Sequence, residues 1–148
     1  MKFKVLSRKK VEQYNVKEKH LLISFRDVGS EVPNFPVNDN RVECLMFEFT
    51  DLNSQQVTRM SDESIKKNKV KLFDKDSAKE IWDVVYKYKD EIKWIIVHCE
   101  VGISRSAGAV AALSKIMNGT DEYFFKHFIP NMLVYKLILN EGMDRDTI

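Results

Sequence analysis

The sequence predicts an α/β fold with a central, mostly parallel sheet of roughly four or five strands flanked by helices. The main observation is that short apolar runs alternate with longer segments whose apolar residues recur every three or four positions. This alternation is typical of parallel strands joined by crossover helices. A second observation is that 148 residues with a hydrophobic fraction of 44% suffice to bury one core. We therefore expect a single domain over residues 1–148.

The composition excludes several classes of protein. Five glycines and three prolines among 31% charged residues do not fit a collagenous or extensively disordered chain. The net charge of +2 does not favour a nucleic-acid or membrane-surface protein, and no apolar stretch approaches the ~20 residues needed to cross a bilayer. Two cysteines and no secretory signal at the start of the chain indicate a cytoplasmic protein with reduced thiols. We expect it to be monomeric.

The first half of the chain contains three predicted strands. They comprise residues 3–6, 21–25 and 42–49. Ser7 is a predicted N-cap for a short helix over residues 8–14, and turn-forming residues throughout 26–40 predict a surface loop. Asp51 follows the third strand, where a strand gives way to a loop. The lysine-rich segment 54–76 has weak periodicity and receives no assignment.

The second half contains one predicted strand and four predicted helices. The apolar stripe of residues 77–92 gives the clearest helix, and residues 94–97 form the fourth strand. The remaining helices are predicted over residues 105–117, 120–127 and 131–140. Gly119 and Gly142 are placed to end the first and last of these three.

The loop between the fourth strand and the next helix has the composition of a phosphate-binding device. Cys99 and Arg105 lie six positions apart, and Gly102 between them permits a tight bend. A loop of this kind aims backbone N–H groups at an anion placed at a helix N-terminus, while an arginine grips two oxygens at once. The residues predicted to bind phosphate are Glu100, Val101, Gly102, Ile103, Ser104 and Arg105.

The same arrangement favours Cys99 as a nucleophile. The helix N-terminus and a nearby guanidinium both favour the thiolate form of a cysteine. Ser106 could donate its hydroxyl proton to the sulfur and make Cys99 a better leaving group. His98 is expected to brace the loop by hydrogen bonding, because a preformed thiolate needs no base.

The string from His98 to Ser106 resembles the signature of the cysteine-dependent protein tyrosine phosphatases. Its Gly-x-Ser-Arg-Ser ending is most similar to the dual-specificity branch and its compact prokaryotic and phage relatives. The resemblance implies hydrolysis of phosphomonoesters through a phosphocysteine intermediate, with no metal and no other cofactor. It also implies a sheet of about four or five strands flanked by helices.

The mechanism of this family further requires an aspartic acid on a separate loop, which protonates the leaving oxygen and then activates water. Asp51 is the candidate, because the carboxyl end of a parallel strand is where α/β sheets gather their active-site loops. Asp62 is the rival, and Asp74 and Asp76 are weaker alternatives. Asp51 could also be a simple turn or cap residue.

Two other function classes stay open. A phosphate-binding or phosphopeptide-binding module could use the same loop without turnover, and rhodanese-like sulfur transfer or arsenate reduction also uses a cysteine loop, although at another length or position. A phosphorylated protein or a small phosphomonoester is favoured as substrate over a phosphoinositide or an RNA triphosphate, because Glu100 would repel a polyanion. Cys44 is either a core residue or a disulfide partner for oxidised Cys99.

Overall fold

The computed structural model describes residues 1–146 and is built on a four-stranded parallel sheet. The strands are β1 (Lys2–Ser7), β2 (His20–Arg26), β3 (Arg41–Glu48) and β4 (Trp94–Cys99). Their order is β1-β4-β2-β3, and every neighbouring pair is parallel. The predicted sheet is therefore confirmed. The last two residues of the predicted domain, 147–148, lie outside the described residues.

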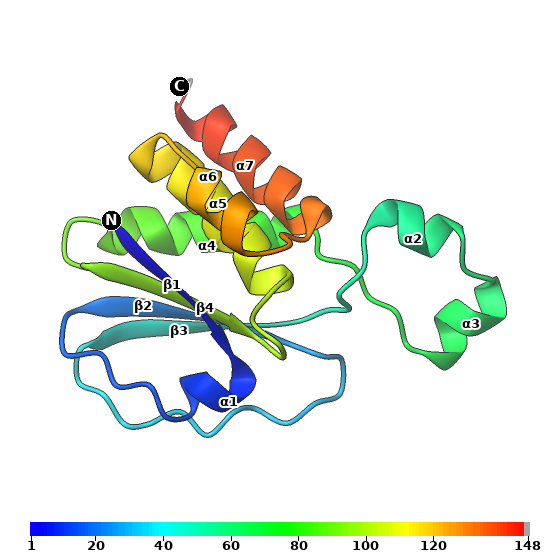
Figure 1. Ribbon diagram of the computed structural model, residues 1–148, viewed down its shortest axis with the longest axis horizontal. Coiled ribbons are helices and arrows are strands. Elements are labelled where there is room, and N and C mark those ends of the chain that lie inside the picture. Colours follow the sequence, from blue (N-terminus) through cyan, green and yellow to red (C-terminus); the bar gives the residue numbers. More distant parts are fainter. Residues whose placement is uncertain (147–148) are drawn as a thin grey trace.

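The upper face of the sheet in Figure 1 is covered by helices. These are α4 (Lys75–Tyr88), α5 (Arg105–Asn118), α6 (Glu122–His127) and α7 (Met132–Asp146). The main core lies between sheet and helices, where fully buried Ile23 and Ile95 pack in one cluster with Leu113. Within the described residues, no helix combines the length and apolar character needed to cross a membrane.

The opposite face carries a smaller core beneath α1 (Arg8–Val11). Leu22 and Ile96 from the central strands pack there with Val11. Alternate side chains of a strand point to opposite faces, so Ile95 and Ile96 contribute to different cores. This helix is shorter than the predicted range 8–14, although Ser7 caps it as predicted by accepting a hydrogen bond from the Lys10 amide at 3.2 Å.

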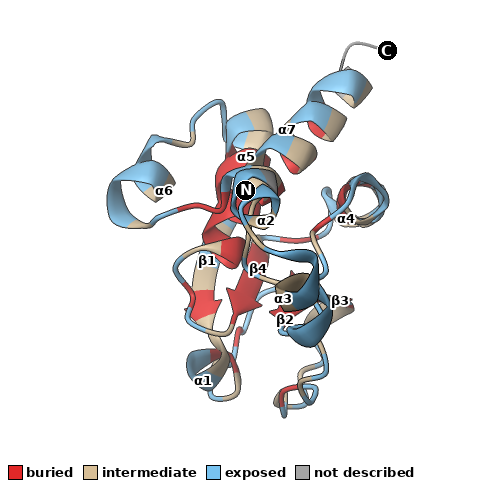
Figure 2. Ribbon diagram, turned by 90° about the vertical axis from the view of Figure 1, so that its right-hand side faces the viewer, coloured by how far each residue is buried: buried red, intermediate tan, exposed pale blue. Residues whose placement is uncertain are grey.

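The segment without a sequence assignment forms two short helices, α2 (Ser54–Thr58) and α3 (Asp62–Lys67). They project from the body of the molecule (Figure 1) and are largely exposed (Figure 2). Asn53 begins α2 with a capping box, and Ser61 caps α3. Short capped turns with little buried surface have no long apolar stripe, which explains why periodicity did not reveal them.

Two further helices differ from their predicted boundaries. Helix α4 begins at Lys75, because the Asp74 carboxylate accepts the Ser77 amide at 2.8 Å, and it ends four residues before the predicted position 92. Helix α7 continues through Gly142, which was predicted to end it. A Cβ at Gly142 would lie 2.6 Å from the Trp82 ring, so this glycine permits close packing between α7 and α4. Gly119, by contrast, ends α5 with a φ of 80°, as predicted.

Candidate active site

The loop between β4 and α5 wraps around the carboxyl end of the sheet. Cys99 is the last residue of β4, and α5 begins at Arg105. Gly102 is buried with a φ of 78°, and a Cβ there would lie 2.6 Å from the Ser7 nitrogen. The bend therefore needs glycine both for its backbone conformation and for its contact with the end of β1.

The sulfur of Cys99 lies inside this loop between a backbone amide and a hydroxyl group. The Gly102 amide donates to Sγ at 3.2 Å, and the Ser106 hydroxyl lies 3.0 Å from Sγ. The Cys99 residue is 2% exposed, at the N-terminal end of α5. The sulfur thus lies among a backbone N–H, a hydroxyl group and the N-terminal end of a helix, where backbone N–H groups carry partial positive charge.

The guanidinium of Arg105 is buried and held at two of its three nitrogens. Nη1 donates to the Phe49 carbonyl at 2.7 Å, and Nη2 lies 2.8 Å from a carboxylate oxygen of Asp27. Nε is buried without a hydrogen-bond partner among the described residues. A buried N–H without an acceptor costs free energy, so an oxyanion at this point would supply the missing acceptor.

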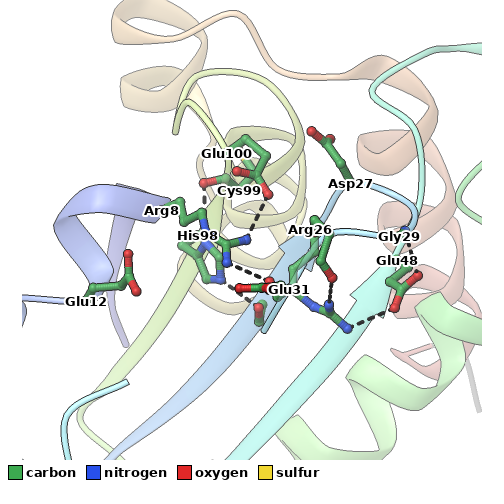
Figure 3. A network of polar contacts seen from close by, with 12 residues as sticks. Arg8, Glu12, Arg26, Asp27, Gly29, Glu31, Glu48, His98, Cys99 and Glu100 are labelled. Carbon is green, nitrogen blue, oxygen red and sulfur yellow. Dashed lines mark hydrogen bonds and ion pairs between the residues drawn. The ribbon is translucent and has the colours of Figure 1, made fainter. Parts of the chain in front are cut away.

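Asp27 is a residue of this site that sequence reasoning missed. It follows β2 directly, and its loop is fixed by Arg26, which pairs with Glu48 at 3.0 Å and donates to the Ser30 carbonyl at 2.7 Å. The Gly29 amide also donates to Glu48 at 3.2 Å (Figure 3). The available signal was its position in the sequence: Asp27 follows the end of a parallel strand, as Asp51 does, and such ends meet at one edge of the sheet.

Glu100 connects the loop to the elements beside it. Its carboxylate lies 3.3 Å from Nη1 of Arg8, whose Nη2 donates to the Glu31 carbonyl at 2.6 Å (Figure 3). The Arg8 amide also donates to the Glu100 carbonyl. Because a guanidinium compensates the charge of Glu100, the repulsion of polyanions that the sequence suggested is weakened.

Asp51 lies at the rim of the loop, on the segment that follows β3. Its Oδ1 accepts hydrogen bonds from the Ser104 hydroxyl and from Nδ2 of Asn131, both at 2.9 Å. Asp62 instead occupies the first turn of α3, which projects from the body. Asp74 is the N-cap of α4, and Asp76 lies in the first turn of that helix. A hydrogen bond from the Ser77 amide lowers the pKa of Asp74. Among the described residues, Asp51 is the one of these four candidates that has a hydrogen bond to the loop.

Asn131 is a second residue that sequence reasoning missed. It is 7% exposed, and its Oδ1 accepts the Leu133 and Val134 amides in the first turn of α7. The backbone N–H of Asn131 donates to the Ser104 carbonyl at 2.9 Å. Asn131 therefore joins α7, the loop and Asp51. The signal was an asparagine at a predicted helix start, which indicates a cap but not a contact with Asp51.

His98 is fully buried on the other face of the sheet from the Cys99 side chain. Its Nε2 lies 2.6 Å from the Ser24 hydroxyl, and Nδ1 lies 3.2 Å from the Cys99 carbonyl. Burial lowers the pKa of His98 to about 4, so the ring is neutral near pH 7. A neutral ring donates one hydrogen bond and accepts the other, which links β4 to β2 directly beneath the loop.

This buried imidazole should make the protein less stable in acid. Between the unfolded pKa of 6.5 and the folded pKa of about 4, the unfolded chain binds a proton that the folded chain excludes. The free energy of unfolding should therefore fall by about 3 kcal/mol as the pH falls across this range. Urea unfolding at pH 7 and pH 4 measures the change. His98→Asn should reduce the pH dependence, whereas His127→Asn, at an exposed histidine, should retain it; equal slopes in both variants would contradict the assignment.

Cys44 lies in the smaller core with Leu22 and Ile96, whereas Cys99 belongs to the main core. The two side chains therefore point to opposite faces of the sheet, and both cysteines are free thiols. This arrangement favours the interpretation of Cys44 as a core residue. Among the described residues, no group of three or more histidine, cysteine or acidic side chains is arranged to hold a metal ion.

Comparison with solved structures identifies the fold. PTPMT1 in complex with PI(5)P superposes with a TM-score of 0.56 at 13% identity, over 99% of this chain and 93% of the other. A second structure of PTPMT1 gives a TM-score of 0.53 at 13% identity, over 99% and 92% of the two chains. This chain has a protein-tyrosine-phosphatase-like fold.

The human tyrosine phosphatase-like serine/threonine/tyrosine-interacting protein also matches, at 17% identity and a TM-score of 0.43, over 88% of this chain and 77% of that one. A scan against protein-family models gave no match, and neither did a search of curated proteins. The phosphatase-like fold is thus recognised from the path of the backbone. The predicted prokaryotic and phage branch stays a prediction.

Proposed function

We propose that the protein is a phosphomonoester hydrolase of the tyrosine or dual-specificity type that works through a phosphocysteine intermediate. The observation that carries this proposal is the position of the Cys99 sulfur between the Ser106 hydroxyl and the Gly102 amide, at the start of the helix that Arg105 opens. The unpartnered Nε of Arg105 supports it, because it offers a donor to a phosphate oxygen.

In the first step, the Cys99 thiolate attacks phosphorus, an S–P bond forms and the P–O bond to the leaving group breaks. The leaving oxygen takes the proton of the Asp51 carboxylic acid. Charge on the three remaining oxygens is met by the amides of residues 100–105 and by Arg105, and fixed donors of this kind supply much of an enzyme's rate enhancement.

In the second step, water attacks phosphorus and gives a proton to the Asp51 carboxylate, while the S–P bond breaks. The electron pair returns to sulfur as a thiolate, which Ser106 and Gly102 stabilise through their hydrogen bonds. Asn131 keeps Asp51 beside Ser104 throughout both steps. Inorganic phosphate then leaves, and the enzyme is regenerated.

A turnover assay with intermediate trapping tests this proposal. The protein should release p-nitrophenol from p-nitrophenyl phosphate in the presence of EDTA. Acid quenching during turnover should leave one phosphoryl group on the peptide that contains Cys99, as measured by mass spectrometry. Saturable binding of phosphate without any release of p-nitrophenol would instead support a phosphate-binding module, and a phosphoryl group on another residue would contradict the mechanism.

The physiological substrate is a separate question. A phosphorylated protein or a small phosphomonoester remains our proposal, but the complex of PTPMT1 with PI(5)P and the pairing of Glu100 with Arg8 justify testing a phosphoinositide as well. Rates of phosphate release from a phosphotyrosine peptide, a phosphoserine peptide and PI(5)P, measured side by side, distinguish these substrate classes.

A further inference from the structure

The free edge of β1 forms the floor of a groove that reaches the candidate active site. One hollow of about 580 Å³ is lined by residues that include Lys4, Lys10 and Gly102, and a second of about 410 Å³ is lined by residues that include Lys2 and Trp94. Both hollows are lined by Lys4, Val5 and Phe128, so they adjoin along the strand. We call this surface the β1 groove. Figure 2 shows β1 at the side of the sheet, between α6 and α1.

The backbone of β1 offers hydrogen-bonding groups to this groove. β1 lies at the edge of the sheet, next to β4. The Lys2 amide donates to Lys93 and the Arg8 amide donates to Glu100, so the even-numbered residues direct their backbone groups toward β4. Because these directions alternate along a parallel strand, the N–H and C=O groups of Phe3 and Val5 face outward. An extended peptide could pair with them as an additional strand.

The charge of the groove selects its occupant. Lys2, Lys4 and Lys10 are exposed. Lys10 lines the larger hollow, Lys2 lines the smaller one and Lys4 lines both. Two copies of this chain paired through β1 would bring Lys2 and Lys4 against the same residues, and like charges on adjoining strands are destabilising. Lysines on an edge strand also hinder non-specific pairing. An acidic strand, by contrast, would be attracted by Lys4 and Lys10, and also by Lys2, which lies 4.0 Å from Glu18.

The groove ends at the loop that holds the nucleophile. Ser7 at the end of β1 is the register partner of Cys99, and Val101 and Gly102 belong to both the groove and the loop. Strands in a sheet lie about 4.8 Å apart, so a strand added to β1 would lie roughly 10 Å from β4. A phosphorylated side chain on that strand would therefore have to pass over the end of β1 to reach the loop.

We propose that the β1 groove binds an acidic, extended segment of a phosphoprotein substrate as an additional strand and thereby delivers the phosphorylated residue to the loop. This inference rests on the proposed function and adds a substrate class to it. The main-chain hydrogen bonds would give affinity without regard to sequence, and the lysines would give preference for acidic residues beside the phosphorylated one.

Charge reversal with a matched control tests the proposal. Lys10→Glu places a negative charge in the groove, whereas Lys9→Glu makes the same change at the neighbouring exposed position of α1, which does not line either hollow. The readout is kcat/KM for a phosphotyrosine peptide with acidic flanks, divided by kcat/KM for p-nitrophenyl phosphate. Lys10→Glu and Lys4→Glu should each lower this ratio about three- to tenfold, and Lys9→Glu should retain it. A neutral-flanked peptide should show no such difference.

Equal ratios for Lys9→Glu and Lys10→Glu would overturn the proposal that the β1 groove binds the substrate, even if turnover itself is normal. Absence of p-nitrophenyl phosphate hydrolysis would overturn the proposed function instead. In that case calorimetry with the unphosphorylated acidic peptide still tests the groove: binding that Lys10→Glu weakens and Lys9→Glu retains supports it, and binding that both retain contradicts it. A dimer in size-exclusion chromatography that dissociates on Val5→Pro, which removes an outward-facing N–H of β1, would assign the edge to a second copy and also contradict the proposal.

Discussion

Replacement of Cys99 by serine should lower the turnover of p-nitrophenyl phosphate by at least about 10⁴-fold, because loss of a nucleophile removes the covalent step. A serine hydroxyl is not ionised near neutral pH, so the donors from Ser106 and Gly102 would have no negative charge to stabilise. Arg105 and the loop amides would be retained. Binding of tungstate, measured by calorimetry, should therefore survive in the variant.

Cys44→Ser is the matched control for this experiment. It makes the same chemical change on the opposite face of the sheet, away from the loop, and should retain turnover. Full activity of Cys99→Ser would end the proposal that the sulfur is the nucleophile. Loss of both turnover and tungstate binding in Cys99→Ser would mean that the substitution has disrupted the loop, which the circular dichroism and unfolding curve of the variant would reveal.

Replacement of Asp51 by asparagine should lower the hydrolysis of an alkyl phosphate about 10²- to 10⁴-fold, the usual contribution of a positioned general acid. The loss should be much smaller with p-nitrophenyl phosphate, because its leaving group scarcely needs a proton. Asparagine retains an Oδ1 that can accept the hydrogen bonds of Ser104 and Asn131, so the variant changes proton transfer with little change in geometry. The measurement is kcat/KM for each substrate in the wild type and the variant.

Asp62→Asn provides the control, since Asp62 was the rival candidate and lies on the projecting helix α3. It should leave both rates close to those of the wild type. Equal losses for the alkyl and aryl substrates in Asp51→Asn would count against a role in protonating the leaving group, and a larger loss in Asp62→Asn would transfer that role to Asp62.

The parts of this molecule that could be predicted from sequence depend on short-range patterns. The strands were visible because residues such as Ile95 and Val97 form compact apolar runs, and the loop was visible because Cys99, Gly102 and Arg105 are close in the chain. Asp51 was found through its position after a strand. Ser104 lies 53 positions from Asp51 in the chain, and Asn131 lies 80 positions away. Of these two partners, only Ser104 belonged to the loop that the sequence had already identified.

The parts that could not be predicted depend on contacts between distant segments. Nothing near Asp27 indicates that its carboxylate pairs with Arg105, because the pairing follows from the order of strands in the sheet. Asn131 resembled an ordinary helix cap, and Gly142 an ordinary helix end, until the packing of α7 against the loop and against Trp82 was known. The helices α2 and α3 depend on local caps and bury little surface, so their pattern was too weak to recognise.

The ion pair between Asp27 and Arg105 has a consequence for which esters this site would accept. The Asp27 side chain is 59% exposed while that of Arg105 is 4% exposed, so an incoming anion meets a carboxylate that already holds one nitrogen of the buried cation. A sulfate ester or a phosphodiester carries a single negative charge, so it gains little by replacing the singly charged Asp27 carboxylate as the partner of Arg105. A doubly ionised monoester gains more from the same exchange. The Asp27 carboxylate would therefore favour doubly charged esters over singly charged ones.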